Sequence, residues 1–498
     1  MPKALNTLQL RPTLKRLQVG LALLTATFYI AGCANTATSA LPPLEINMSP
    51  SFREAEAANL VVSQTVSAQW WESFNDPALS ALVLRGQASN VDVRIALERV
   101  REARAGLDAA DSRLLPTLSF SGGVSDQRTN LSDEVKRGSP DTRVSSGAVE
   151  VNWEIDLFGA ASAAADASDA DALASEAAVA AAQLVATTEV ARHYLIWQGA
   201  KARETTLLQL LQTQTKAEQL TRSREASGEA SAFDVSRAIA QTQSLAAQIP
   251  AIGTLAAVTE HQLAVLLGAS PGGPILTKGN LQTSVLHNPP VFSPGQPADL
   301  LWRRPDLHAA SLQWQAASAR VREAQADRWP RLFLAAAVGQ QDLQINALNL
   351  STAAFSNVAL AFTAPIFNAG RLRAAVQRQA ARERTAWLQM EAAVLRALQD
   401  VEVSLALLRG ERERATALGI AAQQQRVALR HTESMYREGQ VGLLPLLEAQ
   451  RGRLAAELAL IDSQTQVALA TVQLVKALGG GWAAQTSPQS PLTCAPTC

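Results

Sequence analysis

Residues 149–159 read VEVNWEIDLFG, and they decide the fold. Apolar and polar side chains alternate along this stretch, with Val149, Val151, Trp153, Ile155 and Leu157 opposed to Glu150, Asn152, Glu154 and Asp156. A period of two with one apolar face predicts a strand. At Gly159 the pattern changes, because Ala160 to Ala226 contain no proline and are rich in alanine, the best helix former. A single helix of that length, about 100 Å at about 1.5 Å per residue, has to pack against other long helices, as in a coiled coil.

The same order of elements occurs twice in the chain. Pro116 and Pro330 each precede an alternating run and lie 214 residues apart. Further pairs recur in order: Asp92 with Asp306 at 214, Leu157-Phe158 with Ile366-Phe367 at 209, and Gly228 with Gly439 and Leu267-Gly268 with Leu478-Gly479 at 211. Because chance rarely supplies several such pairs in one order, the sequence predicts an internal duplication.

Each repeat is predicted to contain a helix, a β-hairpin, a very long helix and a returning helix. The first repeat, 77–268, divides into a helix at 77–114, a hairpin at 116–158 with a polar loop at 126–143, a long helix at 159–226 and a helix at 231–267. The second, 299–480, divides into a helix, a hairpin at 331–367, a long helix at 370–437 and a helix at 443–478. The remaining segments are an N-terminal extension at 33–76, a connector rich in proline and glycine at 269–298, and a flexible tail at 481–498. The fold class is therefore mainly helical, with a small β component.

The amino terminus has the pattern of an export signal. Residues 1–32 are basic at the start and apolar from Val19 onward, and they end in Ile30-Ala31-Gly32 before Cys33. This ending resembles the bacterial lipoprotein cleavage box, which implies that Cys33 becomes the lipidated first residue. An ordinary signal peptide with an incidental cysteine is the alternative. Ala34 in place of an aspartate favours sorting to the outer membrane, and we expect no transmembrane helix after the signal.

The predicted strands have the length and alternation of membrane-spanning strands. In lipid every backbone group must be paired, so strands cross only as a closed barrel, which four strands cannot form. The hairpins of several copies would have to combine. In that case Trp153, Val151 and Leu360 face lipid, and Glu150, Glu154 and Asp156 face water in the lumen. The alternative is that the hairpins pack against a soluble helical layer.

Composition and motifs argue against several other functions. Lys+Arg 44 balances Asp+Glu 44, which disfavours a nucleic-acid binder, and three cysteines exclude a disulfide-rich scaffold or a four-cysteine zinc site. The five histidines show no metal-ligand spacing, and no catalytic motif is present, so we expect neither an enzyme nor a metal or cofactor. Arg303, Arg304 and Asp306 surround Pro305 and are expected to start a helix. Cys494 and Cys498 could form a disulfide or belong to a loose tail.

Four motifs in order resemble the TolC-like outer-membrane efflux lipoproteins, the NodT-type outer-membrane factors of tripartite efflux systems. They are Trp70 to Leu79 (WWESFNDPAL), Val151 to Gly159, Leu300 to Leu307 (LLWRRPDL) and Ala364 to Arg371 (APIFNAGR). The resemblance implies a homotrimer with a twelve-strand barrel in the outer membrane, continued by a twelve-helix periplasmic tunnel. It also implies a periplasmic adaptor protein and an inner-membrane efflux pump as partners.

The resemblance further implies a periplasmic gate at the turns near Gly228 and Gly439. Asp234, Tyr436 and Glu448 match gate positions, whereas Pro445 replaces a second acid and Val441 replaces an arginine found in some members. We therefore expect closure to rely on hydrogen bonding by Tyr436 and on packing of Leu443 and Leu444. The alternative is that Asp234 and Glu448 are solvated charges at helix ends.

These observations favour a passive exit duct for small molecules, lipid-anchored in the outer membrane. Two other functions stay open at this point: a lipid-anchored periplasmic structural or adaptor protein, and an export duct for secreted proteins. A brace would not need strands with one apolar face, whereas a protein-export duct would share the fold. The sequence does not identify the substrate.

Overall fold

The structure is a computed structural model that describes residues 49–57, 66–128, 130, 132, 141–276, 279, 281, 284–345, 348–350 and 352–482. The predicted signal sequence, Cys33, Cys494 and Cys498 lie outside these residues.

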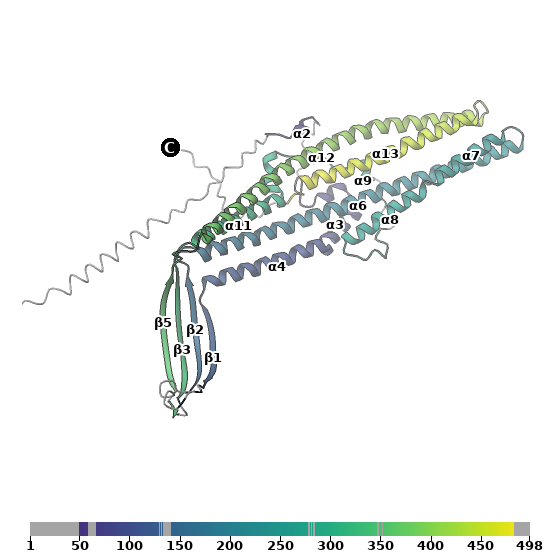
Figure 1. The fold of residues 1–498 in the computed structure, drawn as a ribbon. Helices are drawn as coiled ribbons and strands as arrows, with labels where there is room; N and C mark the ends of the chain where they lie inside the picture. Colours follow the sequence, from purple (N-terminus) through teal and green to yellow (C-terminus); the bar gives the residue numbers. More distant parts are fainter. Residues whose placement is uncertain are drawn as a thin grey trace, which may run out of the picture. The chain divides into compact units, whose positions relative to one another are not determined.

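One antiparallel sheet contains the strands of both repeats (Figure 1). Its order is β1 (Thr117–Gln127), β2 (Thr142–Ile155), β3 (Arg331–Ile345) and β5 (Ala353–Thr363), and the two-residue strand β4 (Leu348–Asn349) also pairs with β3. The polar loop predicted at 126–143 is shorter than expected, because β1 and β2 continue into it from both sides. The two predicted hairpins are thus joined through β2 and β3, which leaves β1 and β5 as the outer strands.

The register gives the sheet two different faces. Leu118 lies opposite Val151, Val151 opposite Ala336, and Ala336 opposite Val358, while two residues along Trp153 lies opposite Leu334 and Leu334 opposite Leu360. Side chains alternate along a strand, so these rows form one apolar face. The other face carries small and polar side chains, such as the row Ser119, Glu150, Ala337 and Asn357.

Four helices follow the same order as the strands. Contacts join α4 (Val91–Asp111) to α6 (Ala160–Ala226), α6 to α11 (Pro305–Ala326), and α11 to α12 (Arg371–Arg437). The helices α6 and α12 each have 67 residues. As in the sheet, elements of the first repeat lie on one side and elements of the second repeat on the other (Figure 1).

The far halves of the two long helices pack with the returning helices. Contacts join α7 (Ala232–Ala246) and α8 (Ile249–Leu266) to α6, α6 to α13 (Leu443–Ala477), and α13 to α12. Gly228 and Gly439 have φ of 78° and 73° in the two turns, a backbone conformation that side chains disfavour. The remaining helices are short or lie at the start of a repeat: α2 (Arg53–Ala57), η1 (Trp70–Phe74), α3 (Pro77–Ser89), η2 (Ser112–Leu114), α9 (Ser284–His287), η4 (Pro297–Asp299) and α10 (Leu300–Arg303).

Two helices predicted as continuous are broken. The helix expected at 77–114 ends at Ser89 and restarts at Val91, because Asn90 caps the new helix by accepting from the N–H groups of Asp92 (2.9 Å) and Val93 (3.2 Å). The helix expected at 231–267 ends at Ala246, and α8 begins with Pro250 in its first turn.

One described segment, Ala232–Leu266, has the length and composition of a membrane-spanning helix, and 22% of its most apolar window is buried. This segment contains α7 and α8, which pack on α6.

The main hydrophobic core lies where the N-terminal motif meets α6 and α13. Trp70, Trp71 and Phe74 are buried there with Tyr194 of α6 and Val475 of α13. Since this core joins both repeats, it fixes the two long-helix hairpins to each other.

Candidate conduit surfaces and hairpin tips

The carboxylates of Glu150 and Glu154 lie on the polar face of the sheet, opposite Trp153. The Ser121 hydroxyl donates to Glu150 Oε1 (2.6 Å), and Arg331 forms an ion pair with Glu154 (3.6 Å). The indole N–H of Trp153 donates to the Leu114 carbonyl (3.0 Å). The sheet can therefore present lipid with one face and water with the other.

Asp156 lies just outside the strand to which the alternation assigns it. It lies one residue beyond the end of β2, and its Oδ2 accepts from the backbone N–H (2.7 Å) and the hydroxyl (2.6 Å) of Ser162 in the first turn of α6. Burial opposes ionisation, but the hydrogen bonds from Ser162 prevail and lower the pKa of Asp156. Asp156 thus connects the strand end to the start of the long helix.

The two strand-to-helix corners have the same backbone but different surroundings. Gly159 and Gly370 precede the long helices with φ of 78° and 85°. Phe158 of the first corner stacks on Trp329, with ring centroids 5.5 Å apart. Phe367, the equivalent residue of the second corner, is 88% exposed. Among the described residues, no aromatic ring stacks on Phe367 as Trp329 stacks on Phe158.

The buried carboxylate of Asp76 explains the motif that precedes α3. Its Oδ1 accepts from the N–H groups of Ala78 (2.8 Å) and Leu79 (3.2 Å), and Pro77 occupies the first turn. Its Oδ2 accepts from the Tyr194 hydroxyl (2.7 Å), which in turn accepts from the Gln198 amide (2.5 Å). Burial and the neighbouring carboxylate raise the pKa of Tyr194. The Asp76-Pro77 pair signals a helix start, but nothing in the sequence indicated Tyr194 as its partner.

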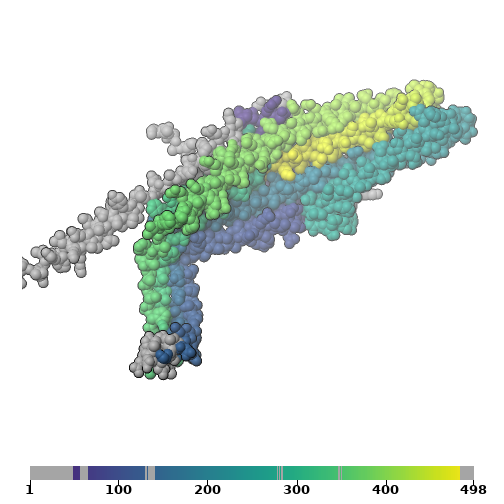
Figure 2. All heavy atoms as spheres, viewed as in Figure 1, coloured from purple at the N-terminus to yellow at the C-terminus, as the bar shows by residue number. Residues whose placement is uncertain are grey.

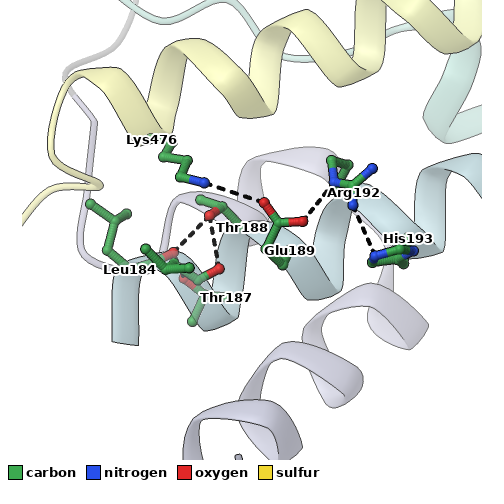
Figure 3. A network of polar contacts seen from close by, with 8 residues as sticks. Leu184, Thr187, Thr188, Glu189, Arg192, His193 and Lys476 are labelled. Carbon is green, nitrogen blue, oxygen red and sulfur yellow. Dashed lines mark hydrogen bonds and ion pairs between the residues drawn. The ribbon is translucent and has the colours of Figure 1, made fainter. Parts of the chain in front are cut away.

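A second polar network connects α6 to α13 (Figure 3). Glu189 accepts from Arg192 (2.6 Å) and from Lys476 of α13 (3.2 Å). Burial opposes ionisation of Glu189, but these two cations lower its pKa. Arg192 donates to Nε2 of His193 (2.9 Å), so Nδ1 of the neutral ring carries the proton. Desolvation and the charge of Arg192 lower the pKa of His193.

Arg304 and Asp306 have the structural role expected of them. Arg304 donates to Asp306 (2.8 Å), to Asp400 of α12 (3.1 Å) and to the carbonyl of Ala477 (3.1 Å). Arg303 forms an ion pair with Asp299 (3.5 Å). These contacts fix the start of α11 against the second long-helix hairpin.

The tips of the two hairpins lie side by side (Figures 1 and 2). Tyr436 of α12 is buried with Ala238 of α7 and with leucines of α12 and α13. The guanidinium of Arg224, from α6, lies 4.6 Å from the centre of the Tyr436 ring and donates to its backbone carbonyl (3.4 Å). The sequence did not indicate Arg224, which connects the two tips through Tyr436.

The other predicted gate residues have local surroundings. Asp234 forms a capping box with Ser231, whose hydroxyl donates to the Asp234 carboxylate (2.8 Å). Glu448 is exposed. In the single chain Leu443 is buried and Leu444 is 44% exposed. Within the described residues, no hydrogen bond or ion pair joins Asp234, Tyr436 and Glu448.

Comparisons with known proteins agree with this architecture. The chain is 28% identical over 421 residues to nodulation protein T of Rhizobium leguminosarum bv. trifolii (83% of this chain, 88% of the relative). It is 28% identical over 472 residues to the toluene efflux pump outer membrane protein TtgC of Pseudomonas putida (94% and 96%). The solved outer-membrane channel OprN is similar with a TM-score of 0.76 at 28% identity, covering 89% of this chain and 98% of that one.

These likenesses confirm the predicted fold class of long helices with few strands, and the expected function in efflux at the outer membrane. The sequence model of the outer membrane efflux protein family matches residues 84–269 and 297–480, which are most of both repeats. The chain belongs to the outer membrane efflux protein family.

Proposed function

We propose that three copies of the chain form one passive exit duct that crosses the outer membrane and continues into the periplasm. The observation that carries this proposal is an order of elements that recurs in three parts of the chain. These parts, here called layers, are the sheet, the four helices next to it, and the far halves of the long helices with their returning helices. In each layer an element of the first repeat lies at one edge (β1, α4 or α8) and an element of the second repeat lies at the other (β5 or α12). Two different edges meet when copies are placed head to tail, and such a contact generates a ring when the rotation between copies closes.

Closure of the sheet is required by its surroundings. Every residue of β1 and β5 is exposed in the single chain, and both outer strands present unpaired backbone groups. Lipid leaves no partner for those groups other than a neighbouring strand. Four strands from each of three copies give the twelve-strand barrel that the family resemblance implies. Trp153, Val151 and Leu360 then face lipid, and Glu150 and Glu154 face the lumen.

The hairpin tips form the periplasmic entrance in this proposal. A periplasmic adaptor and an inner-membrane pump deliver substrate to it, and the pump supplies the energy. The buried ring of Tyr436 and its contact with Arg224 support a role for Tyr436 in holding the tips together. Asp234 and Glu448 contribute negative charge near the entrance, and Asp234 does so while capping α7.

The anchor rests on the sequence alone. We propose that Cys33 is lipidated after removal of residues 1–32. Cys33→Ala should abolish incorporation of labelled palmitate, and Cys494→Ala is the matched control. Palmitate that still enters the Cys33→Ala protein would overturn the assignment.

The substrates proposed are small toxic molecules, including drugs. Relatives are named for toluene and antibiotic efflux and for pyoverdine export. Deletion of the gene, followed by measurement of sensitivity to drugs, dyes and metals, tests the proposal. Increased sensitivity that the intact gene reverses is the expected result. Unchanged sensitivity with a weakened envelope would instead indicate a structural brace.

A further inference from the structure

We propose that each copy contacts the next through a surface built like the contact between its own two repeats, with the helix charges reversed. The inference rests on the proposed ring and assigns its interface. The contact between the repeats is visible within one chain and serves as the template. The equivalent residues at the outer edges are exposed.

The template has a strand region and a helix region. In the strand region Asn152 of β2 lies opposite Ala335 of β3, and Phe158 at the adjoining corner stacks on Trp329. In the helix region a pair of aspartates at the start of α6 forms ion pairs with a pair of arginines at the end of α11. The ion pairs are Asp171 with Arg320 and Asp166 with Arg322 (2.9 Å).

The duplication converts this template into an expected register between copies. The position equivalent to Asn152 is Ala361, 209 residues on, and the position equivalent to Ala335 is Ser121, 214 residues back. Ala361 of β5 therefore lies opposite Ser121 of the next copy. The same register places Phe362 beside Phe120 of the next copy, which continues the apolar face of the sheet around the ring.

The strand-to-helix corners give a second, independent pair of equivalent residues. Phe367 is equivalent to Phe158, and Leu115 is equivalent to Trp329. Phe367 is 88% exposed and Leu115 is 65% exposed, whereas their counterparts Phe158 and Trp329 stack on each other. Packing Phe367 on Leu115 of the next copy would cover both with the contact already present inside the chain.

The helices carry opposite charges at the two contacts. The first turns of α6 contain the acids Asp166, Asp169 and Asp171 and no base. The equivalent turns of α12 contain five exposed arginines: Arg371, Arg373, Arg378, Arg382 and Arg384. Within the described stretches of the chain none of the five forms an ion pair. Glu383, the acid among them, is buried.

Helix α4, which would meet α12 of the previous copy, also carries the opposite charge to its equivalent, α11. Arg322 of α11 is equivalent to Asp108 of α4, and Glu102, Asp108 and Asp111 are exposed near the end of α4. Among the described residues these three acids also have no ion pair. In the long helices the repeat offset is 211, as between Gly228 and Gly439, so Gln377 is equivalent to Asp166 and comes level with Asp108 of the next copy. Arg378 is the next residue of α12. Opposite charges attract there, which favours α12 beside α4 of the next copy.

Paired cysteines test the register. Ala361→Cys with Ser121→Cys should give a disulfide-linked trimer on a non-reducing gel, because directly opposite Cβ atoms are about 4.5–5.5 Å apart. The matched control is Ala359→Cys with Ser121→Cys, which is slipped by two residues on the same face and should link poorly. Efficient linking of the control pair in place of the first would contradict the proposed register.

A charge exchange tests the helix region. Arg378→Asp and Asp108→Arg should each lower the trimeric fraction, by roughly fivefold if about 1 kcal/mol is lost at the contact. The double variant should restore it, and failure of that rescue would contradict the pairing. Native mass spectrometry of the unchanged protein separates the two proposals. A trimer without the predicted links overturns only this inference, whereas the absence of any ring overturns the proposed function.

Discussion

The Asp76 carboxylate accepts a hydrogen bond from the Tyr194 hydroxyl across 2.7 Å, and this contact joins the first residues of the repeat to the middle of α6. The two residues are 118 positions apart in sequence, and both are buried. Asp76 also caps α3, so one carboxylate serves two structural purposes.

Removal of the phenol should destabilise this core. Tyr194→Phe keeps the ring but removes the hydroxyl that donates to the buried Asp76 carboxylate, and the loss of that hydrogen bond costs about 1–3 kcal/mol. Thermal unfolding of the purified protein, followed by circular dichroism, measures the effect. Asp76→Asn, which retains a capping oxygen, should cost less than Asp76→Ala. Equal stability of Tyr194→Phe and the wild type would contradict the importance of this contact.

His193 should make the protein less stable in mild acid. The pKa of His193 is lowered in the folded chain, so the unfolded chain binds the proton first as the pH falls below 6.5, and stability decreases with it. Protonation also removes the lone pair that accepts from Arg192. Glu189 does not contribute to the loss of stability in this range. Its pKa is lowered in the folded chain, so the stability that its ionised form provides is lost only as the pH falls below about 4.5.

The matched variant is His193→Gln, which offers an acceptor to Arg192 but does not titrate. Between pH 7.5 and pH 5.5 the melting temperature should fall more for the wild type than for the variant, in which His308, whose pKa is also lowered by burial, still titrates. If both proteins lose the same stability, the acid sensitivity comes from other groups.

A cation on the apolar face of the sheet should impair assembly, and a cation on the other face should not. Leu360→Arg places a charge toward lipid, at a cost of about 2–4 kcal/mol near the middle of a bilayer. Ala361→Arg, one residue along, is the control on the polar face. The yield of trimer in outer-membrane fractions is the measurement. Equal yields for the two variants would show that this face does not meet lipid.

Loss of the contact between the tips should open the entrance. Tyr436→Ala removes a buried aromatic ring at about 3–5 kcal/mol, and Arg224→Ala removes its cation at about 0.5–2 kcal/mol. Both should raise channel conductance and sensitise cells to large antibiotics, Tyr436→Ala more strongly. Glu448→Gln, at an exposed position, should change cation selectivity with little leak. A trimeric Tyr436→Ala protein that conducts like the wild type would place the gate elsewhere.

The sequence predicts the elements that depend on periodicity and on local residue preference. The alternation from Val149 to Ile155 specifies a strand with two faces, and the proline-free run after Gly159 specifies a long helix. The break at Asn90 is not predicted, although Asn90 is a favourable cap followed by Asp92, because the apolar spacing continues across it. The break before α8 is likewise not predicted, although Pro250 is a residue that suits the first turn of a new helix.

Long-range contacts are not predictable in the same way. Tyr194 meets Asp76, and Arg224 meets Tyr436, only because packing brings separate helices together. Periodicity predicts Asp156 as a strand residue, whereas it lies one residue beyond the end of β2 and accepts from Ser162 of the following helix. Its exposure to the lumen stays a prediction. Periodicity extrapolated past the end of β2 does not distinguish a strand residue from one that accepts from the following helix.

The most direct test of the whole account is to measure stoichiometry and conduction on the same preparation. The full-length protein is purified in detergent, its mass is measured by native mass spectrometry, and the same sample is inserted into planar bilayers. A duct built from three copies should give a single trimeric species and discrete ion-conducting channels, whose conductance rises in Tyr436→Ala. A monomer, or a trimer that never conducts even when Tyr436 is replaced, would contradict the claim that the chain forms a duct.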